Sequence, residues 1–170
     1  MRPAHTKLAP VVGTSGPRIE RYLPAHRDGL AALVSGVLVE LGFSVDPVLD
    51  ADLARPEEFY DVIWVVLDAQ QVVGCVAMRC LGNGEAVGEA ELKRMYLLPA
   101  YRGLGLGRKL LEAALGWARL EHVRAVRLDT GSDMAAAQRF YEAAGFERWG
   151  TRTEVGAGAC RCELLYRMVI

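Results

Sequence analysis

The sequence predicts a single α/β domain with a mixed, mostly antiparallel central sheet flanked by helices. The 170 residues are 52% hydrophobic and 24% charged, which suits one globular domain rather than two. Stretches rich in β-branched residues alternate with stretches of helical period. A glycine-rich turn joins a strand to an amphipathic helix in the middle of the chain. This order of elements favours a mixed sheet with a strand–glycine loop–helix site.

Composition and charge argue against several classes of function. The formal net charge is -1, so we expect no broad basic surface for nucleic acid. No apolar run approaches the roughly 20 residues that span a bilayer, and the N-terminus lacks the apolar stretch of a secretory signal. We therefore expect a cytoplasmic protein without membrane contacts. Residues 1–17 are expected to form a flexible tail, followed by one domain at 18–170.

The cysteines and histidines give no sign of a metal site. Cys75, Cys80, Cys160 and Cys162 form neither C-x-x-C pairs nor a disulfide framework, and the three histidines are far apart. No spacing links a histidine to a second ligand. We expect structural thiols, no covalent acyl-enzyme and no metal.

The N-terminal half is expected to hold a short strand at 18–24, two helices and a hairpin. Five apolar residues share one face of the first helix: Leu30, Leu33, Val34, Val37 and Leu41. Gly42 should end this helix. The stretch 44–61, with six acidic residues and one arginine, is expected to hold a short second helix. Strands near 62–68 and 71–81 flank a polar turn and predict an antiparallel hairpin.

A glycine-rich loop at 81–90 leads into a strand that ends at Pro99. Strict alternation along this strand predicts one face with Glu91, Lys93, Met95 and Leu97, and the other with Leu92, Arg94, Tyr96 and Leu98. The remaining elements are a helix from 106, a strand at 125–130, a helix ending at 144, and strands at 146–152 and 160–170. Ser132 or Asp133 should cap the second of these helices, and Gly145 should end it.

The segment YRGLGLGRKLL, at 101–111, predicts an anion site. A helix N-terminus presents unpaired backbone N–H groups and the positive end of the helix dipole, and glycine allows a close approach. Arg102, Arg108 and Lys109 add positive charge, so a diphosphate would fit. The alternative is an ordinary tight turn. A Walker loop requires a hydroxyl residue after the lysine, and a dinucleotide fingerprint requires glycine at position 108; neither is present.

Two motifs in order resemble the GNAT acyltransferase superfamily. The first is R-x-x-G-x-G, formed by Arg102, Gly105 and Gly107, and the second is AQRFYEAAGF at 137–146. The resemblance covers roughly residues 18 to 170 and implies acetyl-coenzyme A as co-substrate. It implies that backbone amides of the loop bind the pyrophosphate. These are the amides of Gly103, Leu104, Gly105, Leu106, Gly107 and Arg108. It also implies that pantetheine enters a gap between two splayed strands and pairs with backbone groups near Met95 and Leu97.

The same resemblance suggests two catalytic residues. Glu91 lies where histone-acetylating relatives carry a glutamate base, and an apolar setting would raise its pKa toward the working range. Glu89 or an ordered water could serve instead, and Glu91 could simply be a solvated or ion-paired carboxylate. Tyr141 lies where the family has its usual tyrosine acid for the departing thiolate. The alternative is that Tyr141 is a core aromatic.

We therefore expect an N-acyltransferase that moves acetyl from acetyl-coenzyme A to a primary amine of a small molecule in a ternary complex. Acetylation of a protein N-terminus or lysine stays open, as does a non-catalytic acyl-CoA-binding module. Met134 replaces an asparagine that many relatives use to contact the cofactor. The acidic stretch at 46–61 could attract a cationic amine, or could be a solvated face. The oligomeric state, a homodimer included, is left open.

Overall fold

The computed structural model describes residues 16–82, 88–152 and 163–170. The expected tail lies almost entirely outside the described residues, as do Cys160 and Cys162. The strands are β1 (Arg18–Arg21), β2 (Val62–Asp68), β3 (Gln71–Leu81), β4 (Glu89–Leu97), β5 (Ala125–Thr130), β6 (Glu147–Thr151) and β7 (Leu164–Val169). The α-helices are α1 (Arg27–Glu40), α2 (Pro56–Phe59), α3 (Leu106–Leu120) and α4 (Ala135–Ala143).

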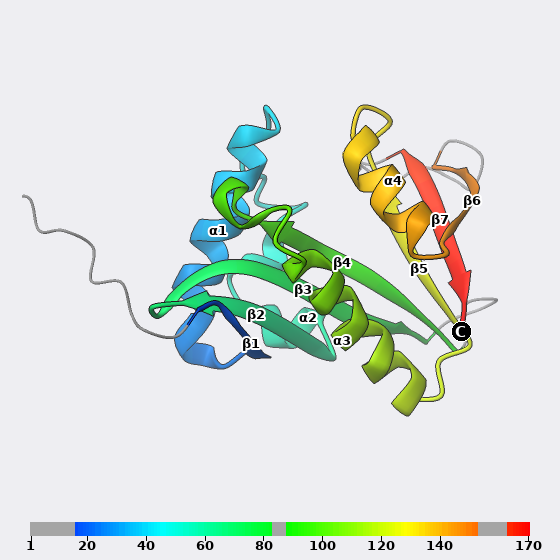
Figure 1. Ribbon diagram of the computed structural model, residues 1–170, viewed down its shortest axis with the longest axis horizontal. Coiled ribbons are helices and arrows are strands. Elements are labelled where there is room, and N and C mark those ends of the chain that lie inside the picture. Colours follow the sequence, from blue (N-terminus) through cyan, green and yellow to red (C-terminus); the bar gives the residue numbers. More distant parts are fainter. Residues whose placement is uncertain (1–15, 83–87, 153–162) are drawn as a thin grey trace, which may run out of the picture.

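The seven strands form one sheet in the order β1-β2-β3-β4-β5-β7-β6 (Figure 1). Among the described strands, every neighbouring pair is antiparallel except β4 and β5, which run parallel. The predicted mixed, mostly antiparallel sheet is therefore confirmed, and so is the hairpin of β2 and β3. Its two-residue turn uses Ala69 and Gln70 with φ of 44° and 75°, the left-handed geometry that such hairpins require.

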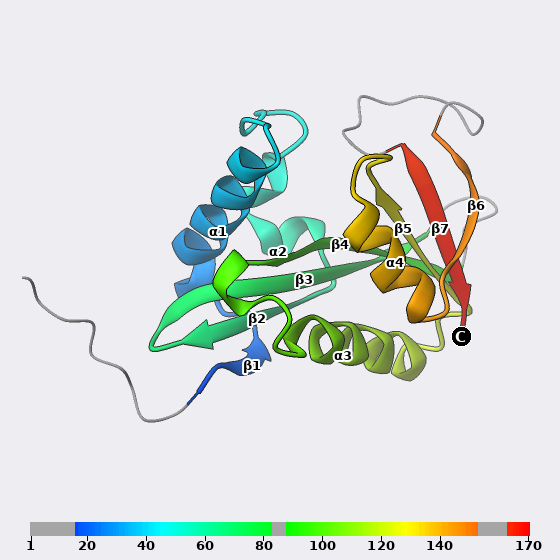
Figure 2. The same cartoon turned by 45° about the horizontal axis from the view of Figure 1, so that its top comes forward.

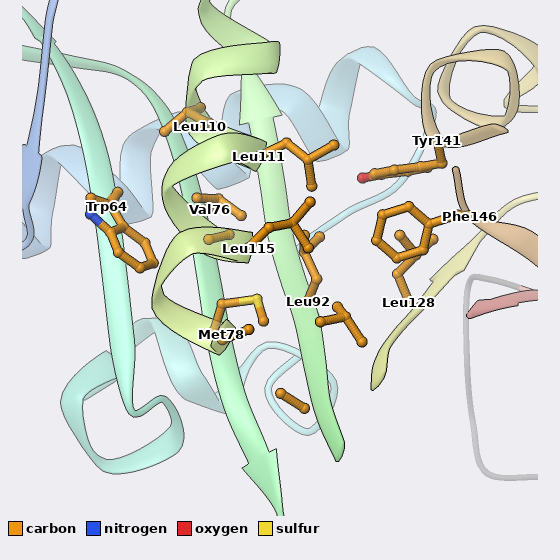
Figure 3. Close-up of a cluster of buried hydrophobic side chains, with 14 of the residues drawn as sticks. Trp64, Val76, Met78, Leu92, Leu110, Leu111, Leu115, Leu128, Tyr141 and Phe146 are labelled. Carbon is orange, nitrogen blue, oxygen red and sulfur yellow. The ribbon is translucent and has the colours of Figure 1, made fainter. Parts of the chain in front are cut away.

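Helices cover both faces of the sheet (Figure 2). Helix α1 packs on one face, where its apolar stripe meets side chains of β2 and β3 such as Val65 and Cys75. Helices α3 and α4 lie on the other face, over a larger core (Figure 3). Leu110 and Ala114 of α3 are fully buried there against Val76 and Met78. The two apolar layers hold the strands that carry the site between rigid supports.

Glycines end α1 and α4 as predicted. At the end of α4, the Phe146 N–H donates to the Tyr141 carbonyl and the Gly145 N–H donates to Glu142, with φ of 99° at Gly145. This is the Schellman pattern, and Gly42 ends α1 in the same way. The predicted cap at the start of α4 is wrong. The helix starts at Ala135 with Met134 at the N-cap position, and no side chain among the described residues caps it. Ser132 donates to Glu163 instead.

A β-bulge in β4 overturns the predicted alternation. Lys93 pairs with Ala77 and Tyr96 with Cys75, so two residues of β4 lie opposite one of β3. The inserted residue is Arg94, whose φ is 53°. A bulge reverses which face the following residues occupy. Three side chains accordingly pack on the α3 face, Leu92, Met95 and Leu97, while Tyr96 packs on the α1 face.

Strand β4 separates from β5 soon after its start. The two strands pair only from Glu89 to Glu91, opposite Ala125 to Arg127. Beyond that point β4 continues through Leu97 beside β3 alone, and the gap between β4 and β5 widens (Figure 1). The splayed strands that the sequence resemblance implied are therefore present. Among the described residues, no helix has both the length and the apolar character needed to cross a membrane.

Candidate active site

A cavity of about 330 Å³ opens where β4 separates from β5. The middle of β4 forms its floor, α4 and the end of β5 form one wall, and the C-terminal end of α1 forms the other. Its main lining residues are Leu38, Phe43, Asp50, Arg79, Glu91, Lys93, Arg94, Met95, Tyr96, Asp129, Met134, Tyr141 and Arg152. Three residues predicted from the sequence, Glu91, Met95 and Tyr141, therefore meet at one cavity although 50 positions separate the first from the last.

Glu91 lies in a charged setting, so the expectation of an apolar one is wrong. The Arg79 Nε donates to a Glu91 carboxylate oxygen at 2.7 Å, and the Lys93 Nζ lies 3.6 Å from the other oxygen. The Glu91 side chain is 14% exposed. The reason is the bulge, which separates Glu91 from Met95 and Leu97 and leaves it beside Lys93. Two cations therefore orient the carboxylate at the cavity wall.

Glu89, the alternative base, lies away from the cavity. Its carboxylate is buried and bound by the guanidinium groups of Arg127 and Arg167, the latter at 2.8 Å. Burial alone would raise the pKa of Glu89, but the hydrogen bonds from these two arginines outweigh it and the pKa is lowered. A lowered pKa and a position outside the cavity lining both oppose proton uptake by Glu89 from an amine bound in the cavity.

Tyr141 projects from α4 toward β4 (Figure 3). Its ring is held edge-on between Phe140 and Phe146, with ring centroids 5.3 and 5.7 Å away. The side chain is buried, and the hydroxyl end points away from Phe146 toward the strand. The two readings of Tyr141 are thus compatible, because its ring belongs to the core while the residue lines the cavity.

The glycine loop lies at the end of β4 and leads directly into α3. Gly103 and Gly105 have φ of 73° and 78°, which favour glycine, and a Cβ added to either would meet no protein atom within 4 Å. No side chain of the described residues caps the first turn of α3. The first backbone N–H groups of the helix therefore face open space at its positive end. The loop is not part of the cavity wall. A Cβ on Gly107 would lie 3.6 Å from the Leu97 side chain and 3.8 Å from that of Phe140, which are the chain neighbours of the lining residues Tyr96 and Tyr141.

Arg102 is held by contacts with α1 and with the end of β4. Its guanidinium binds both carboxylate oxygens of Glu40, at the end of α1, at 2.6 and 2.7 Å. Its Nε also donates to the Leu97 carbonyl at 2.9 Å. Arg102 thus ties the loop and the end of β4 to α1. The charge of Arg108 is directed to Glu112, one turn further along α3.

The acidic stretch has a buried part and an exposed part, since Glu57, Glu58 and Asp61 are exposed. Asp50 and Asp52 are buried, and both bind the guanidinium of Arg94 at the bulge. Tyr60 donates to Asp52 at 2.8 Å, and burial together with that carboxylate raises the pKa of Tyr60. Glu57 pairs with Arg27 on α1. Asp50 and Asp52 therefore hold the segment between α1 and β2 against β4.

Sequence reasoning missed a row of alternating charges along the cavity. The row runs Arg79, Glu91, Lys93, Asp129, Arg152. The Lys93 Nζ lies 3.0 Å from Asp129, and Arg152 also binds Asp129. Burial lowers the pKa of Lys93, but Asp129 and Glu91 outweigh this effect and the pKa is raised. The members come from β3, β4, β5 and the end of β6, so no local spacing in the sequence could reveal the row.

The described thiols show no sign of catalytic use. Cys75 is fully buried on the α1 face and its Sγ lies 2.8 Å from the Arg94 carbonyl. Burial raises the pKa of Cys75 to about 12, which opposes formation of a thiolate. Within residues 16–82, 88–152 and 163–170, no group of three or more His, Cys, Asp or Glu side chains could hold a metal ion.

A mixed sheet splayed between its two parallel strands, beside a glycine loop that opens a helix, defines an α/β domain with a strand–glycine loop–helix connection. Residues 38–146 match the model of the acetyltransferase (GNAT) family. The uncharacterized N-acetyltransferase YjgM of Escherichia coli K12 is 31% identical over 143 residues, which cover 80% of this chain and 85% of that protein. The chain belongs to the GNAT acetyltransferase family.

The chain spans less than half the length of the N-acetylaspartate synthetases it matches, but nearly the whole length of several solved structures with the same fold. The N-acetylaspartate synthetase of Xenopus tropicalis is 35% identical over 107 residues, which cover 60% of this chain and 38% of that protein. A GNAT acetyltransferase structure from Staphylococcus aureus Mu50 has a TM-score of 0.81 and 21% identity, covering 91% of this chain and 99% of its own. The PaiA N-acetyltransferase of Thermoplasma acidophilum, solved with coenzyme A, has a TM-score of 0.68 and 14% identity. The match covers 92% of this chain and 100% of that protein.

Proposed function

We propose that this protein transfers an acetyl group from acetyl-coenzyme A to the primary amine of a small molecule by direct attack in a ternary complex. The observation that carries the proposal is that Glu91 and Tyr141 line one cavity from opposite sides of the splayed strands, next to the bare N-terminus of α3. Membership of the GNAT family and the coenzyme A complex of a protein with the same fold support acetyl-coenzyme A as co-substrate.

In this proposal the pyrophosphate binds the N–H groups of residues 103–108, and pantetheine enters the gap beside β4. Each hydrogen bond to a charged group contributes roughly 1.5 to 3 kcal/mol net. Backbone groups near Met95 and Leu97 would pair with pantetheine and polarise the thioester carbonyl. The Leu97 carbonyl already accepts the Arg102 Nε, so Arg102 contributes by holding this part of β4 in place. Met134 lines the cavity and offers a thioether where relatives offer an amide.

The chemical step requires a neutral amine, which is scarce at neutral pH because alkylamines have a pKa of about 10.4. Glu91, directly or through a water molecule, would take the amine proton. The nitrogen then attacks the thioester carbon, a C–N bond forms, and the C–S bond breaks. Tyr141 would give its hydroxyl proton to the departing thiolate. The nitrogen loses its second proton to solvent as the C–S bond breaks, and Tyr141 regains a proton from solvent. The products are the N-acetylated amine and free coenzyme A.

Substitution of Gly105 by alanine tests the cofactor site. The added Cβ meets no protein atom within 4 Å, so it would occupy the space proposed for the pyrophosphate. We expect at least a 10-fold loss in affinity for acetyl-coenzyme A by calorimetry, with about 1 to 2 kcal/mol lost from the free energy of unfolding because of the left-handed φ.

Gly42→Ala is the matched control. Gly42 has φ of 80° and an equally open Cβ position, but lies at the end of α1. It should lose similar stability and keep its affinity for acetyl-coenzyme A. Equal affinities in the wild type and both variants would contradict the proposed loop. Release of coenzyme A thiol with a panel of amines separates an enzyme from a module that only binds the thioester.

A further inference from the structure

We propose that the acceptor is an amino acid, whose carboxylate binds the basic side chains of the charged row Arg79–Glu91–Lys93–Asp129–Arg152. This inference rests on the function proposed above and specifies the class of acceptor. The row contains three cations and two carboxylates, and every member lines the cavity. Lys93 lies at its centre, between Glu91 and Asp129.

Exposure within the row determines which charges an incoming molecule meets. The side chains of Glu91 and Asp129 are 14% and 6% exposed, whereas those of Arg79, Lys93 and Arg152 are 41%, 27% and 31% exposed. The carboxylates therefore lie beneath the cations, each contacted by two of them. A cationic group on the acceptor finds no unpaired carboxylate in this row, while an anionic group finds guanidinium and ammonium donors on the open side.

The other charges that line the cavity do not change this conclusion. Arg94 and Asp50 neutralise each other, with Asp52 behind them. Among the described residues, the lining thus includes four basic and three acidic side chains. Lys93 keeps its proton at neutral pH because its pKa is raised by the two neighbouring carboxylates. The row itself holds one more basic than acidic side chain, and this local excess favours binding of a carboxylate. With Asp52 counted beside Arg94, the remaining charges add no further cation.

The spacing within the row also suits an amino acid. The Lys93 Nζ and a Glu91 oxygen are 3.6 Å apart, so a cation and the proposed base lie side by side. An α-amino acid carries its amine and its carboxylate on one carbon, and both groups fit this arrangement. Nearby positive charge also lowers the pKa of an amine. The cations that bind the carboxylate would therefore help the amine to lose its proton.

The test compares each amino acid with its own amide as acceptor. Thiol release from acetyl-coenzyme A gives kcat/KM for the twenty L-amino acids and for the amides of those that react. We expect the best amino acid to exceed its amide by about 10-fold or more, since one charge-assisted contact changes affinity by that order. In Lys93→Gln this ratio should fall toward one, and in Lys93→Arg it should be retained.

The ratio separates recognition from a structural role of Lys93. Loss of Lys93 could misplace Glu91, but a misplaced base would slow acetylation of the amino acid and of its amide equally. The ratio of the two kcat/KM values would then stay unchanged. Arg119→Gln, which removes an exposed cation from the far end of α3, should keep the wild-type ratio. Three results would each overturn the inference. They are an unchanged ratio in Lys93→Gln, equal kcat/KM for an amino acid and its amide in the wild type, and a preference for peptide N-termini.

A binding measurement keeps the two proposals distinguishable. If no amine is acetylated, the proposed transfer fails, and calorimetry on the protein saturated with coenzyme A then tests the carboxylate site alone. Tighter binding of amino acids than of their amides would support the site without turnover. Absence of such a preference would overturn it. If amino acid amides are acetylated with the same kcat/KM as the amino acids, the transferase proposal stands and the proposed amino-acid acceptor does not.

Discussion

At the scale of single residues, Tyr141 combines a structural and a proposed chemical role. The ring packs between two phenylalanines, so replacing tyrosine by phenylalanine keeps the packing and removes only the hydroxyl. We expect Tyr141→Phe to lower kcat by about 100-fold, as the loss of a general acid does, with acetyl-coenzyme A still bound. Steady-state kinetics and calorimetry measure the two effects.

Tyr166→Phe is the control for this substitution. Tyr166 is buried in the same core, and its hydroxyl donates to Glu142 at 2.9 Å, outside the cavity. The Tyr166→Phe variant should keep the wild-type kcat while its free energy of unfolding falls. Unchanged turnover in Tyr141→Phe would remove the acid role and leave Tyr141 as a core aromatic.

Arg94 is the residue that shapes β4. Its φ of 53° creates the bulge, and its guanidinium is held by Asp50 and Asp52 from the segment before β2. Replacement by methionine leaves two buried carboxylates without their cation. We expect Arg94→Met to lose about 3 kcal/mol or more of unfolding free energy, as removal of one partner from a buried ion pair does. Urea denaturation at neutral pH measures the loss.

An exposed pair supplies the comparison. Arg55 and Glu58 bind each other at 2.9 Å with both side chains more than half exposed. Arg55→Met should cost less than about 1 kcal/mol. Similar losses for Arg55→Met and Arg94→Met would mean that the Arg94 cluster is solvated and does not hold the bulge.

At the scale of elements, the contact between Arg102 and Glu40 joins the glycine loop to α1. We expect Arg102→Ala to weaken binding of acetyl-coenzyme A because the loop and the end of β4 lose their support. If Arg102 acts by positioning, Glu40→Gln should weaken binding in the same direction, by a smaller factor. Calorimetry with acetyl-coenzyme A gives both affinities.

The opposite response would indicate a direct contact with phosphate. Glu40 neutralises Arg102, so its removal would free the guanidinium and strengthen binding of an anion. Arg108 offers a further comparison, since it lies in the first turn of α3 and pairs only with Glu112 among the described residues. Tighter binding in Glu40→Gln would therefore contradict the positioning role.

At the scale of the whole molecule, two buried carboxylates make stability depend on pH. Burial raises the pKa of Asp129 and of Glu89, but the basic partners of each outweigh it and both pKa values are lowered. A carboxyl group with a lowered folded pKa stabilises the fold above its ordinary pKa of about 4, and this contribution is lost as the pH falls through the folded value. We expect Tm to be steady near neutrality and to fall below about pH 4.

Substitution of both groups identifies the source of this acid sensitivity. The double variant Glu89→Gln and Asp129→Asn should have a lower Tm at neutral pH and a flatter dependence on pH between about 5 and 3. Thermal melts across that range provide the test. A dependence as steep as that of the wild type would assign acid unfolding to other carboxylates.

Much of the fold and part of the site could be predicted from local pattern. The hairpin at 62–68 and 71–81, the glycine loop and the glycine that ends α4 depend on residues close in sequence, because hydrophobic period and turn chemistry act locally. The two motifs that resemble the GNAT superfamily also lie within short segments. These features led to Tyr141 and Glu91, which the structure brings to one cavity.

Tertiary contacts decided the rest. No glycine marks the bulge at Arg94. The guanidinium of Arg94 is held there by Asp50 and Asp52, which lie more than 40 positions earlier in the chain. The bulge then reverses the face of Met95 and Leu97 and leaves Glu91 among charges. The alternating charges likewise come from three strands and from Arg152, the residue after β6, and assemble only when the sheet forms. Local sequence specifies period and turns, whereas ion pairs between distant segments depend on which strands become neighbours.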